Sequence, residues 1–346
     1  MKINQRSIGI GSQTYIIAEM SGNHNKSLDR AKEIIHAMKK SGADAVKLQT
    51  YTPDTLTIKS NRKEFKVGKG TLWEGKFLYD LYSEAHTPWE WHPKLKRIAN
   101  DLGMDLFSTP FDDTAVDFLE EMGVPAYKVA SFEIVDLELI RKIAATGKPI
   151  IMSTGMASLE EIKDAVAAAY EGGAKDIALL KCTSAYPTPP EESNVRVIPD
   201  LATRFKLPIG LSDHTLGIVV PVAAVTLGAC IVEKHFTMDR SEPGPDNAFS
   251  LEPQEFKGMV DAVRIAEKAL GKVVYGTTKK EQASKVFRRS LFVVEDVRAG
   301  EVLTNKNVRS IRPGNGLPPK EINNVLGKKA AKDITRGTPL SSDLIA

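Results

Sequence analysis

Cysteine is scarce in this sequence, with only Cys182 and Cys230 among 346 residues. Both lie in apolar segments without the spacing of a metal site, so we expect buried thiols in a reduced, cytoplasmic chain. No apolar run approaches the roughly 18 residues of a membrane helix, and the polar N-terminal stretch lacks the apolar core of a signal peptide. An excess of one charge is missing too: 47 Lys and Arg against 44 Asp and Glu argue against a general nucleic-acid binder.

Nucleotide-binding motifs are also missing. Neither GxGxxG nor a P-loop occurs, which weakens the case for an open doubly wound sheet. Short apolar runs instead alternate with longer amphipathic segments, the pattern of βα units and a parallel sheet. The runs that we expect to form strands are residues 15–19, 45–49, 105–108, 126–130, 149–153, 177–181, 209–212 and 231–235. Eight such units in about 270 residues predict an α/β fold, a (β/α)8 TIM barrel.

The domain organisation follows from a change in the pattern of predicted secondary structure along the chain. We expect a catalytic barrel over residues 1–271, which ends with a helix over Pro253–Leu270, and a linker over residues 272–287. Residues 288–346 then show short strands with Gly and Pro at turns, which predicts a small β-rich domain. This domain is basic, with 11 Lys or Arg against 6 Asp or Glu, a net charge of +5. The rest of the chain therefore carries a net charge of −2.

One connection is much longer than the others. Residues 51–86, between the second and third strands, are polar and Lys-rich and contain Trp73. An insertion after a barrel strand lies on the active-site face, so this segment could cover the substrate. A disordered surface loop is the alternative, and the sequence leaves both open.

Polar residues stand where nearly every predicted strand ends, which is where barrel enzymes place their chemistry. A single polar end could be the N-cap of the next helix. Lysine, however, is a poor N-cap and is costly to bury unpaired, so the whole set favours function. The set comprises Glu19, Lys47, Gln49, Ser108, Thr109, Lys128, Ser131, Ser153, Thr154, Lys181, Ser184, Ser212, His214, Glu233 and His235.

Strand alternation places two histidines together. In GLSDHT and IVEKHFT, His214 shares a side with Ser212, and His235 shares a side with Glu233, so both imidazoles can converge on the barrel mouth. Two neutral imidazoles can hold a divalent metal such as Mn²⁺, Mg²⁺ or Co²⁺, completed by water and substrate oxygens. Such a metal would act as a Lewis acid on a substrate oxygen. Two core histidines bonded to the backbone are the alternative.

Two lysines and several hydroxyls form a second group. Ammonium and hydroxyl donors suit a phosphate and a carboxylate on one small ligand. The group consists of Lys47, Lys128, Ser131, Ser153 and Ser212. A competing hypothesis makes one lysine a Schiff-base former, as in aldolases of the same fold. The paired histidines argue against an imine mechanism, since it needs no metal.

Other polar residues have weaker patterns. His24 in GNHN could be a further ligand, but we favour a turn residue, and His86 and His92 look like part of a packed helix start. Asp246, in a turn-rich loop after the last strand, could accept hydrogen bonds from substrate hydroxyls. Arg312 lies beside a turn in the basic domain, where composition alone favours a surface salt bridge.

Ten ordered motifs together resemble the sialic acid synthase family, and the last domain resembles that family's SAF, or antifreeze-like, domain. The motifs are AEMSGNHNKSLD, ADAVKLQTYTPDT, LFSTPFD, YKVASFEI, IMSTGM, KCTSAYPTPP, GLSDHT, EKHFT, GPDNAFSLEP and SIRPGNGL. Within the family, YTPDT, TPWEWHP, EIVDLELI and GPDNAFSLEP look most like the pseudaminic acid synthase branch. The sialic acid branch more often reads GINHNG and GPDHKAS at the corresponding places.

The resemblance implies a reaction, in which phosphoenolpyruvate condenses with the open-chain aldehyde of an N-acetylated sugar and releases phosphate. For the pseudaminic branch the sugar is 2,4-diacetamido-2,4,6-trideoxy-L-altrose. N-acetylneuraminate and legionaminate synthases are alternatives within the family. An inactive barrel that carries a glycan-binding SAF domain is an alternative of another class, against which intact His214, His235, Lys47 and Lys128 argue.

The resemblance also implies roles for individual residues. His214 and His235 hold the metal, and Glu19 is a candidate general base. The phosphoenolpyruvate site receives Lys47, Thr109, Lys128, Ser131, Ser153, Ser184 and Ser212, although the family often has Asn where Ser184 stands. The sugar site receives Glu19, Gln49, Tyr186, Asp246 and Arg312. Arg312 would reach the barrel of a second subunit, which implies a domain-swapped homodimer. This role for Arg312 takes the place of the surface salt bridge expected from composition alone.

Overall fold

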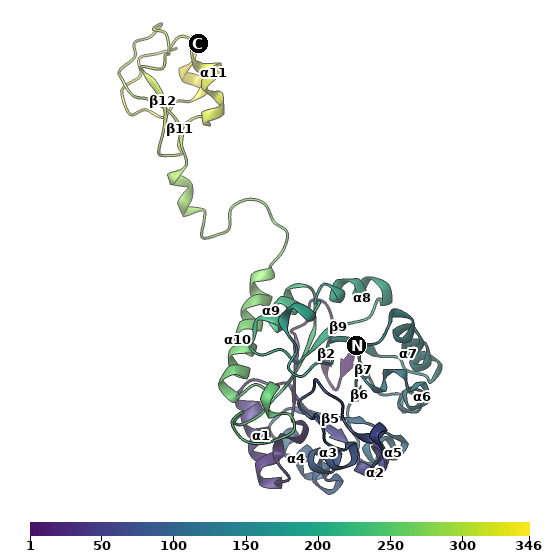
Figure 1. The fold of residues 1–346 in the computed structure, drawn as a ribbon. Coiled ribbons are helices and arrows are strands. Elements are labelled where there is room, and N and C mark those ends of the chain that lie inside the picture. Colours follow the sequence, from purple (N-terminus) through teal and green to yellow (C-terminus); the bar gives the residue numbers. More distant parts are fainter. The chain divides into compact units, whose positions relative to one another are not determined.

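The computed structural model describes all 346 residues of the chain. The chain divides into two compact units, Met1–Gly271 and Lys272–Ala346 (Figure 1). Each unit has its own apolar core.

The first unit is built on a closed barrel of eight parallel strands, in the order β10-β3-β4-β5-β6-β7-β8-β9. The strands are β3 (Tyr15–Glu19), β4 (Ala45–Thr50), β5 (Asp105–Pro110), β6 (Tyr127–Val129), β7 (Ile150–Ser153), β8 (Ile177–Cys182), β9 (Ile209–Asp213) and β10 (Ile231–His235). Each one overlaps a predicted run and ends within two residues of it. The predicted (β/α)8 barrel is therefore confirmed.

Helices surround the barrel in Figure 1. They are α1 (Leu28–Lys40), α4 (His92–Asp101), α5 (Asp113–Met122), α6 (Leu137–Ala145), α7 (Leu159–Glu171), α8 (Val197–Phe205), α9 (Val219–Thr226) and α10 (Pro253–Leu270). Local sequence sets their ends. Ser158 caps α7 by accepting a hydrogen bond from the Glu161 amide, and Gly123 ends α5 with φ 67°. None of the helices is long and apolar enough to cross a membrane.

The amino ends of the strands are closed by a short hairpin of β1 (Lys2–Ile3) and β2 (Arg6–Ser7). Ile3 is fully buried in the same apolar cluster as Tyr15 and Phe107. Apolar side chains thus fill the barrel at the amino ends of the strands. The polar residues are confined to the carboxyl ends of the strands.

The long segment after β4 is structured. It forms α2 (Pro53–Leu56), the 3₁₀ turn η2 (Lys63–Phe65) and α3 (Leu78–Ala85) before the turn η3 (Trp89–Trp91). Thr52 caps α2 through a capping box with Thr55, and Pro53 occupies the first turn. The disordered-loop alternative is therefore wrong.

Further 3₁₀ turns follow the strands at the carboxyl end. They are η1 (Ser21–His24), η4 (Glu133–Val135), η5 (Pro190–Glu192) and η6 (Asn247–Phe249).

The second unit has few regular elements. These are η7 (Ala283–Phe287), β11 (Ser290–Val293), β12 (Val308–Ile311), η8 (Pro319–Glu321), α11 (Ile322–Val325) and η9 (Ser342–Leu344). β11 and β12 pair antiparallel, and isolated bridges such as Phe292 with Pro339 extend the β structure. Its core includes the buried residues Leu291, Val308 and Leu340.

Candidate active site

Polar side chains from seven of the eight strands meet inside the carboxyl end of the barrel. Parallel register sets them side by side: Glu19 pairs with Lys47, Gln49 pairs with Thr109, and His235 pairs with Glu19. The strand positions that face inward are Glu19, Lys47, Gln49, Thr109, Lys128, Ser153, Cys182, Ser212, Glu233 and His235. Most of the predicted site residues on the strands are therefore brought together at one mouth.

A buried ion-pair cluster lies on one side of this mouth. The Lys47 ammonium is 2.9 Å from Glu19 Oε2 and 3.2 Å from Glu233 Oε1. All three side chains are buried. Burial opposes the charge on Lys47, but the two carboxylates outweigh this effect and raise its pKa above the ordinary value. Burial raises the pKa of Glu19, whereas for Glu233 the charges of Lys128 and Lys47 outweigh burial and lower the pKa.

Lys128 lacks such a counter-ion. Its Nζ donates to Ser153 Oγ at 2.7 Å and to the Val129 carbonyl at 3.0 Å, and only 1% of the residue is exposed. Burial lowers the pKa of Lys128 for this reason. A buried ammonium that contacts only neutral oxygens favours an anionic ligand.

Further hydroxyls belong to residues at the carboxyl ends of the strands and the loops that follow them. Ser131 and Ser184 share a hydrogen bond of 2.8 Å, and Ser212 Oγ donates to Glu233 Oε1 at 3.2 Å. A Cβ added to Gly155 would lie 2.4 Å from Ser131 Cβ, so the backbone comes very near at this point. Thr109 Oγ1 is buried without a hydrogen-bond partner. Short donors around an unpaired ammonium suit a phosphate and a carboxylate.

The two predicted metal ligands face each other. The ring centroids of His214 and His235 are 5.4 Å apart. Nδ1 of His214 lies 2.8 Å from the Thr183 carbonyl, which only accepts, so this nitrogen carries the proton and Nε2 is the ring nitrogen that could bind a cation. Nδ1 of His235 is buried without a partner, and burial lowers the pKa of His235 well below its ordinary value.

This pair fits a loosely held divalent metal. Two facing imidazoles, one of them with an orphaned buried nitrogen, match such an ion better than a pair of backbone-bonded core histidines. No group of three or more His, Cys, Asp or Glu side chains forms a metal cage. Water and substrate oxygens would therefore supply the remaining ligands.

A chamber of about 350 Å³ opens above these residues. The predicted residues that line it are Gln49, Ser131, Tyr186, His235 and Asp246. The Tyr186 ring packs 4.4 Å from that of His214 and 5.0 Å from that of Phe249. Gln49 donates to Glu19 at 3.1 Å, and Ser21 donates to Asp246. Polar groups and rings in one chamber suit a sugar.

Glu133 and Trp73 are among the lining residues that were not predicted as site residues. Glu133, in η4, has a buried Oε2 without a partner, and burial raises the pKa of its carboxyl to about 7. Trp73 donates from Nε1 to the Pro245 carbonyl at 2.8 Å, and its ring lies 5.4 Å from that of Tyr186. The available signal for Glu133 was its place two residues after Ser131.

Several polar strand ends point away from the mouth, which corrects the prediction that all of them belong to the site. Lys181 donates to the Cys182 carbonyl at 2.6 Å and Ser108 bonds Thr50 at 2.6 Å. Thr154 donates to the Leu180 carbonyl at 3.2 Å. Strand alternation explains these positions, because each is next to an inward-facing residue.

Asp213 and Lys234 also face outward. They form a fully buried ion pair between β9 and β10, and Asp213 accepts hydrogen bonds from the Thr215 amide at 3.1 Å and hydroxyl at 3.0 Å. Asp213 therefore lies behind the two histidines of the mouth.

His24 and His92 are held by hydrogen bonds to neighbouring residues outside the mouth. His24 Nε2 bonds Thr87 at 3.0 Å and its Nδ1 accepts from the Lys26 amide at 3.1 Å, which confirms the turn interpretation. His92 bonds Thr50 at 2.9 Å. Cys182 and Cys230 are buried free thiols, as expected.

Arg312 belongs to the second unit. It directly follows β12 and is exposed.

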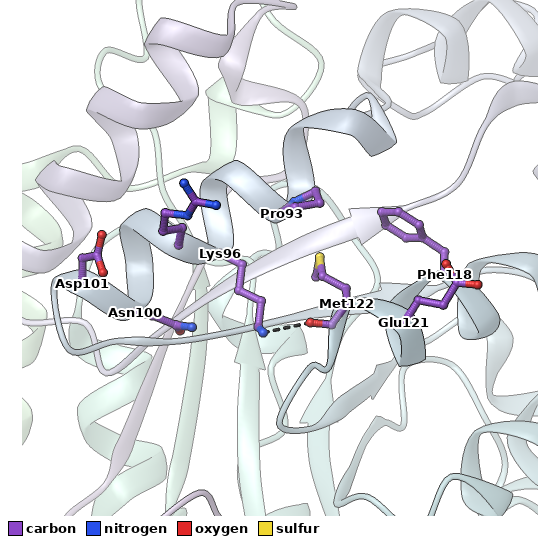
Figure 2. A pocket seen from close by; sticks show the side chains of 8 residues that line it. Pro93, Lys96, Asn100, Asp101, Phe118, Glu121 and Met122 are labelled. Atoms are coloured by element: carbon purple, nitrogen blue, oxygen red, sulfur yellow. Dashed lines mark hydrogen bonds between the residues drawn. The ribbon is translucent and has the colours of Figure 1, made fainter.

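A second hollow of about 570 Å³ lies between α4 and α5 (Figure 2). Lys96 crosses it to donate to the Met122 carbonyl at 2.9 Å. None of the predicted site residues lines it.

Comparison with known proteins identifies the family. The NeuB family profile matches residues 34–275, and the SAF domain profile matches residues 288–346. The chain belongs to the NeuB family. It is an enzyme, a member of the phosphoenolpyruvate-dependent nonulosonic acid synthases that its motifs resemble. Enzymes of the NeuB family generally use a divalent metal.

Similar proteins cover the NeuB-family chain almost end to end. A pseudaminic acid synthase of Helicobacter pylori is 46% identical, over 95% of this chain and 96% of its own. An N,N'-diacetyllegionaminic acid synthase of Legionella pneumophila is 39% identical, over 96% and 94%. The crystal structure of a spore coat polysaccharide biosynthesis protein of Bacillus subtilis aligns with a TM-score of 0.67 at 33% identity, covering 100% and 99% of the two chains.

Proposed function

We propose that this enzyme is a pseudaminic acid synthase. It would condense phosphoenolpyruvate with 2,4-diacetamido-2,4,6-trideoxy-L-altrose, giving pseudaminic acid and phosphate. The observation that carries the proposal is a buried Lys128 without a carboxylate partner, at the same mouth as the His214 and His235 pair. Identity of 46% to a Helicobacter pylori pseudaminic acid synthase supports the choice of sugar.

Phosphoenolpyruvate brings the negative charge that Lys128 lacks. Its phosphate and carboxylate would take donors from Lys47, Thr109, Lys128, Ser131, Ser153, Ser184 and Ser212. The Thr109 hydroxyl is already without a partner, so it is free to donate. Charge-assisted hydrogen bonds of this kind are about twice as strong as neutral ones.

His214 and His235 would hold the divalent ion, Mn²⁺, Mg²⁺ or Co²⁺, and when bound this ion supplies Lewis-acid polarisation of the aldehyde oxygen. The Thr183 carbonyl fixes the His214 tautomer, which leaves Nε2 available as a ligand.

The bond changes then balance in two stages. C3 of phosphoenolpyruvate attacks the aldehyde carbon, and the aldehyde oxygen becomes a hydroxyl. Water adds to C2 as a hydroxyl. The C2–O bond to phosphate then breaks, and the C2 hydroxyl gives its proton to the leaving phosphate, which leaves a ketone. Glu19 takes the proton from water, which matches the proton that the aldehyde oxygen gains. Burial raises the pKa of Glu19, which suits a base, and Gln49 and the Ser21 amide orient its Oε1 at 3.1 Å each.

The sugar would occupy the chamber above, against Gln49, Tyr186 and Asp246, with Glu133 as a further acceptor. Arg312 of a second copy would contact an acetamido group, in a domain-swapped homodimer. Exposed apolar side chains in the loops after β6, β7 and β9 support an interface at this end of the barrel. They are Phe132, Val135, Met156, Leu216 and Val219, exposed by 54–76%. The two buried free thiols fit a cytoplasmic enzyme.

An N-acetylneuraminate or legionaminate synthase is the alternative within the family, favoured by the 39% identity to a legionaminic acid enzyme. An imine-forming aldolase is a different mechanism. The lowered pKa of buried Lys128 favours it, since imine formation needs a neutral amine.

Phosphate release from phosphoenolpyruvate, with the sugar present, tests the proposal. We expect release that EDTA abolishes and added Mn²⁺ restores. Release that is unchanged by saturating EDTA would refute the metal role. Borohydride trapping of sugar on Lys128 would establish the imine mechanism instead.

A further inference from the structure

The chamber has two chemically different ends. Its polar end consists of barrel residues, with Gln49, Glu133, His235 and Asp246 as the groups that can hydrogen-bond or ligate. Much of the apolar lining comes from one stretch of the chain, the segment after β4. We call these residues the apolar wall: Leu56, Val67, Trp73, Leu78, Leu81 and Ala85.

The wall is fixed in place by regular contacts. Val67 donates to the Lys76 carbonyl at 2.9 Å and accepts from the Gly75 amide at 3.0 Å, which closes a tight hairpin. Trp73 is tied to Pro245 by its indole N–H. Leu78, Leu81 and Ala85 follow a helical spacing and form one face of α3. The wall is therefore an ordered surface of the chamber.

Charge is excluded from this surface although the segment is rich in it. Every Lys, Arg, Asp and Glu between Leu56 and Ala85 is exposed, and none lines the chamber. The indole N–H of Trp73 is already used by Pro245. Among the residues of this segment that line the chamber, the other polar side-chain groups are the phenols of Tyr51 and Tyr82. Their rings pack edge to face with centroids 5.7 Å apart.

We propose that the apolar wall binds a deoxygenated carbon of the sugar, at the end of the chain away from the aldehyde, and selects against sugars with a hydroxyl there. The inference rests on the proposed function, which puts the aldehyde at His235. A methyl group loses nothing on leaving water for this wall, whereas a hydroxyl loses its water partners and finds none on the aliphatic side chains. The wall thereby distinguishes a 6-deoxy from a 6-hydroxy acetamido sugar.

The test compares 2,4-diacetamido-2,4,6-trideoxy-L-altrose with its 6-hydroxy counterpart, as the ratio of kcat/KM values at saturating phosphoenolpyruvate. An apolar pocket discriminates against an added hydroxyl by at most about 100-fold, so we expect a ratio of about 10–100 for the wild type. Val67→Thr keeps the shape of the side chain and adds a hydroxyl to the wall. It should lower the ratio of the two kcat/KM values about tenfold. Leu78→Asn should do the same.

Ile58→Thr is the matched control, because Ile58 is 61% exposed in the same segment and does not line the chamber. It should leave the ratio unchanged. An unchanged ratio in both Val67→Thr and Leu78→Asn would overturn the inference, as would a wild type that prefers the hydroxylated sugar. Calorimetric binding of the two sugars gives the same comparison without turnover. Equal affinities for the two sugars would overturn the inference about the apolar wall. If the protein binds the 6-deoxy sugar more tightly but releases no phosphate, only the proposed function is overturned.

Discussion

Burial and pairing give the ionisable side chains of the barrel mouth different properties. Lys47 contacts two carboxylates, whereas Lys128 contacts only neutral oxygens. His235 has an orphaned buried nitrogen, and Glu133 an orphaned buried oxygen. Buried groups that lack a hydrogen-bond or ion-pair partner within the protein are the ones that a ligand can pair with. The predictions for single residues therefore concern these groups.

The histidine pair should determine metal affinity. His235→Ala removes one of the two proposed protein ligands, and we expect Mn²⁺ binding to weaken by at least about 100-fold, more than loss of an outer-shell partner costs. Titration calorimetry of the purified protein measures this without turnover. His36→Ala, on the exposed side of α1, is the control and should bind Mn²⁺ normally. Wild-type affinity in His235→Ala would remove the histidines from the metal site.

Glu133 should make stability depend on pH. Burial raises the pKa of its carboxyl from 4.5 to about 7, so the folded state opposes ionisation. The resulting loss of stability develops between these two pH values, is complete above pH 7 and is absent below pH 4.5. Glu133→Gln should therefore raise the free energy of unfolding at pH 8 by about 1–3 kcal/mol and leave it unchanged at pH 4.5. Urea titrations at the two pH values measure the difference, and an equal effect at both would contradict it.

At the scale of elements, the barrel and several polar residues of the chamber were predictable, and the apolar lining of the chamber was not. Alternation and apolar runs mark β3 through β10 because each strand is buried on both sides. The segment 51–86 has no such pattern, since its apolar residues are spread among exposed charges and meet only in three dimensions. Lys181 was misplaced because a polar residue at a strand end reveals its face only when the neighbouring positions are compared.

The outward-facing pair between β9 and β10 yields a prediction about stability. Lys234→Met leaves Asp213 charged and buried, and we expect a loss of about 3–5 kcal/mol in the free energy of unfolding. The double variant Asp213→Leu with Lys234→Met removes both charges and should recover most of this loss. Urea denaturation measures both variants. A single variant as stable as the wild type would show that Asp213 finds water or another partner.

At the scale of the whole molecule, the net charge of +3 is the sum of two parts of the chain with opposite net charges. These parts have different roles in the proposed function. The barrel carries the reacting groups, and the basic second unit carries Arg312. In the proposed domain-swapped dimer the two units act across subunits, so the functional unit is a dimer rather than one chain.

Arg312→Ala should raise the KM for the sugar about tenfold or more, in line with the loss of a charged hydrogen bond, and leave the KM for phosphoenolpyruvate unchanged. Arg309→Ala is the control, because Arg309 is an exposed arginine on the neighbouring β12. Mixing Arg312→Ala with His235→Ala subunits should then restore activity, since a swapped dimer regains one intact site. Failure of the mixture to exceed its components would contradict a site shared between subunits.

The central claim is tested most directly by the product. The enzyme is incubated with phosphoenolpyruvate, Mn²⁺ and, separately, 2,4-diacetamido-2,4,6-trideoxy-L-altrose, N-acetylmannosamine and the legionaminic acid precursor. Mass spectrometry then identifies what forms. We predict that the altrose derivative reacts fastest and yields pseudaminic acid with one phosphate released per product. Preferred use of N-acetylmannosamine or the legionaminic precursor would contradict the proposed substrate, and no product from any of the three would contradict the proposed reaction.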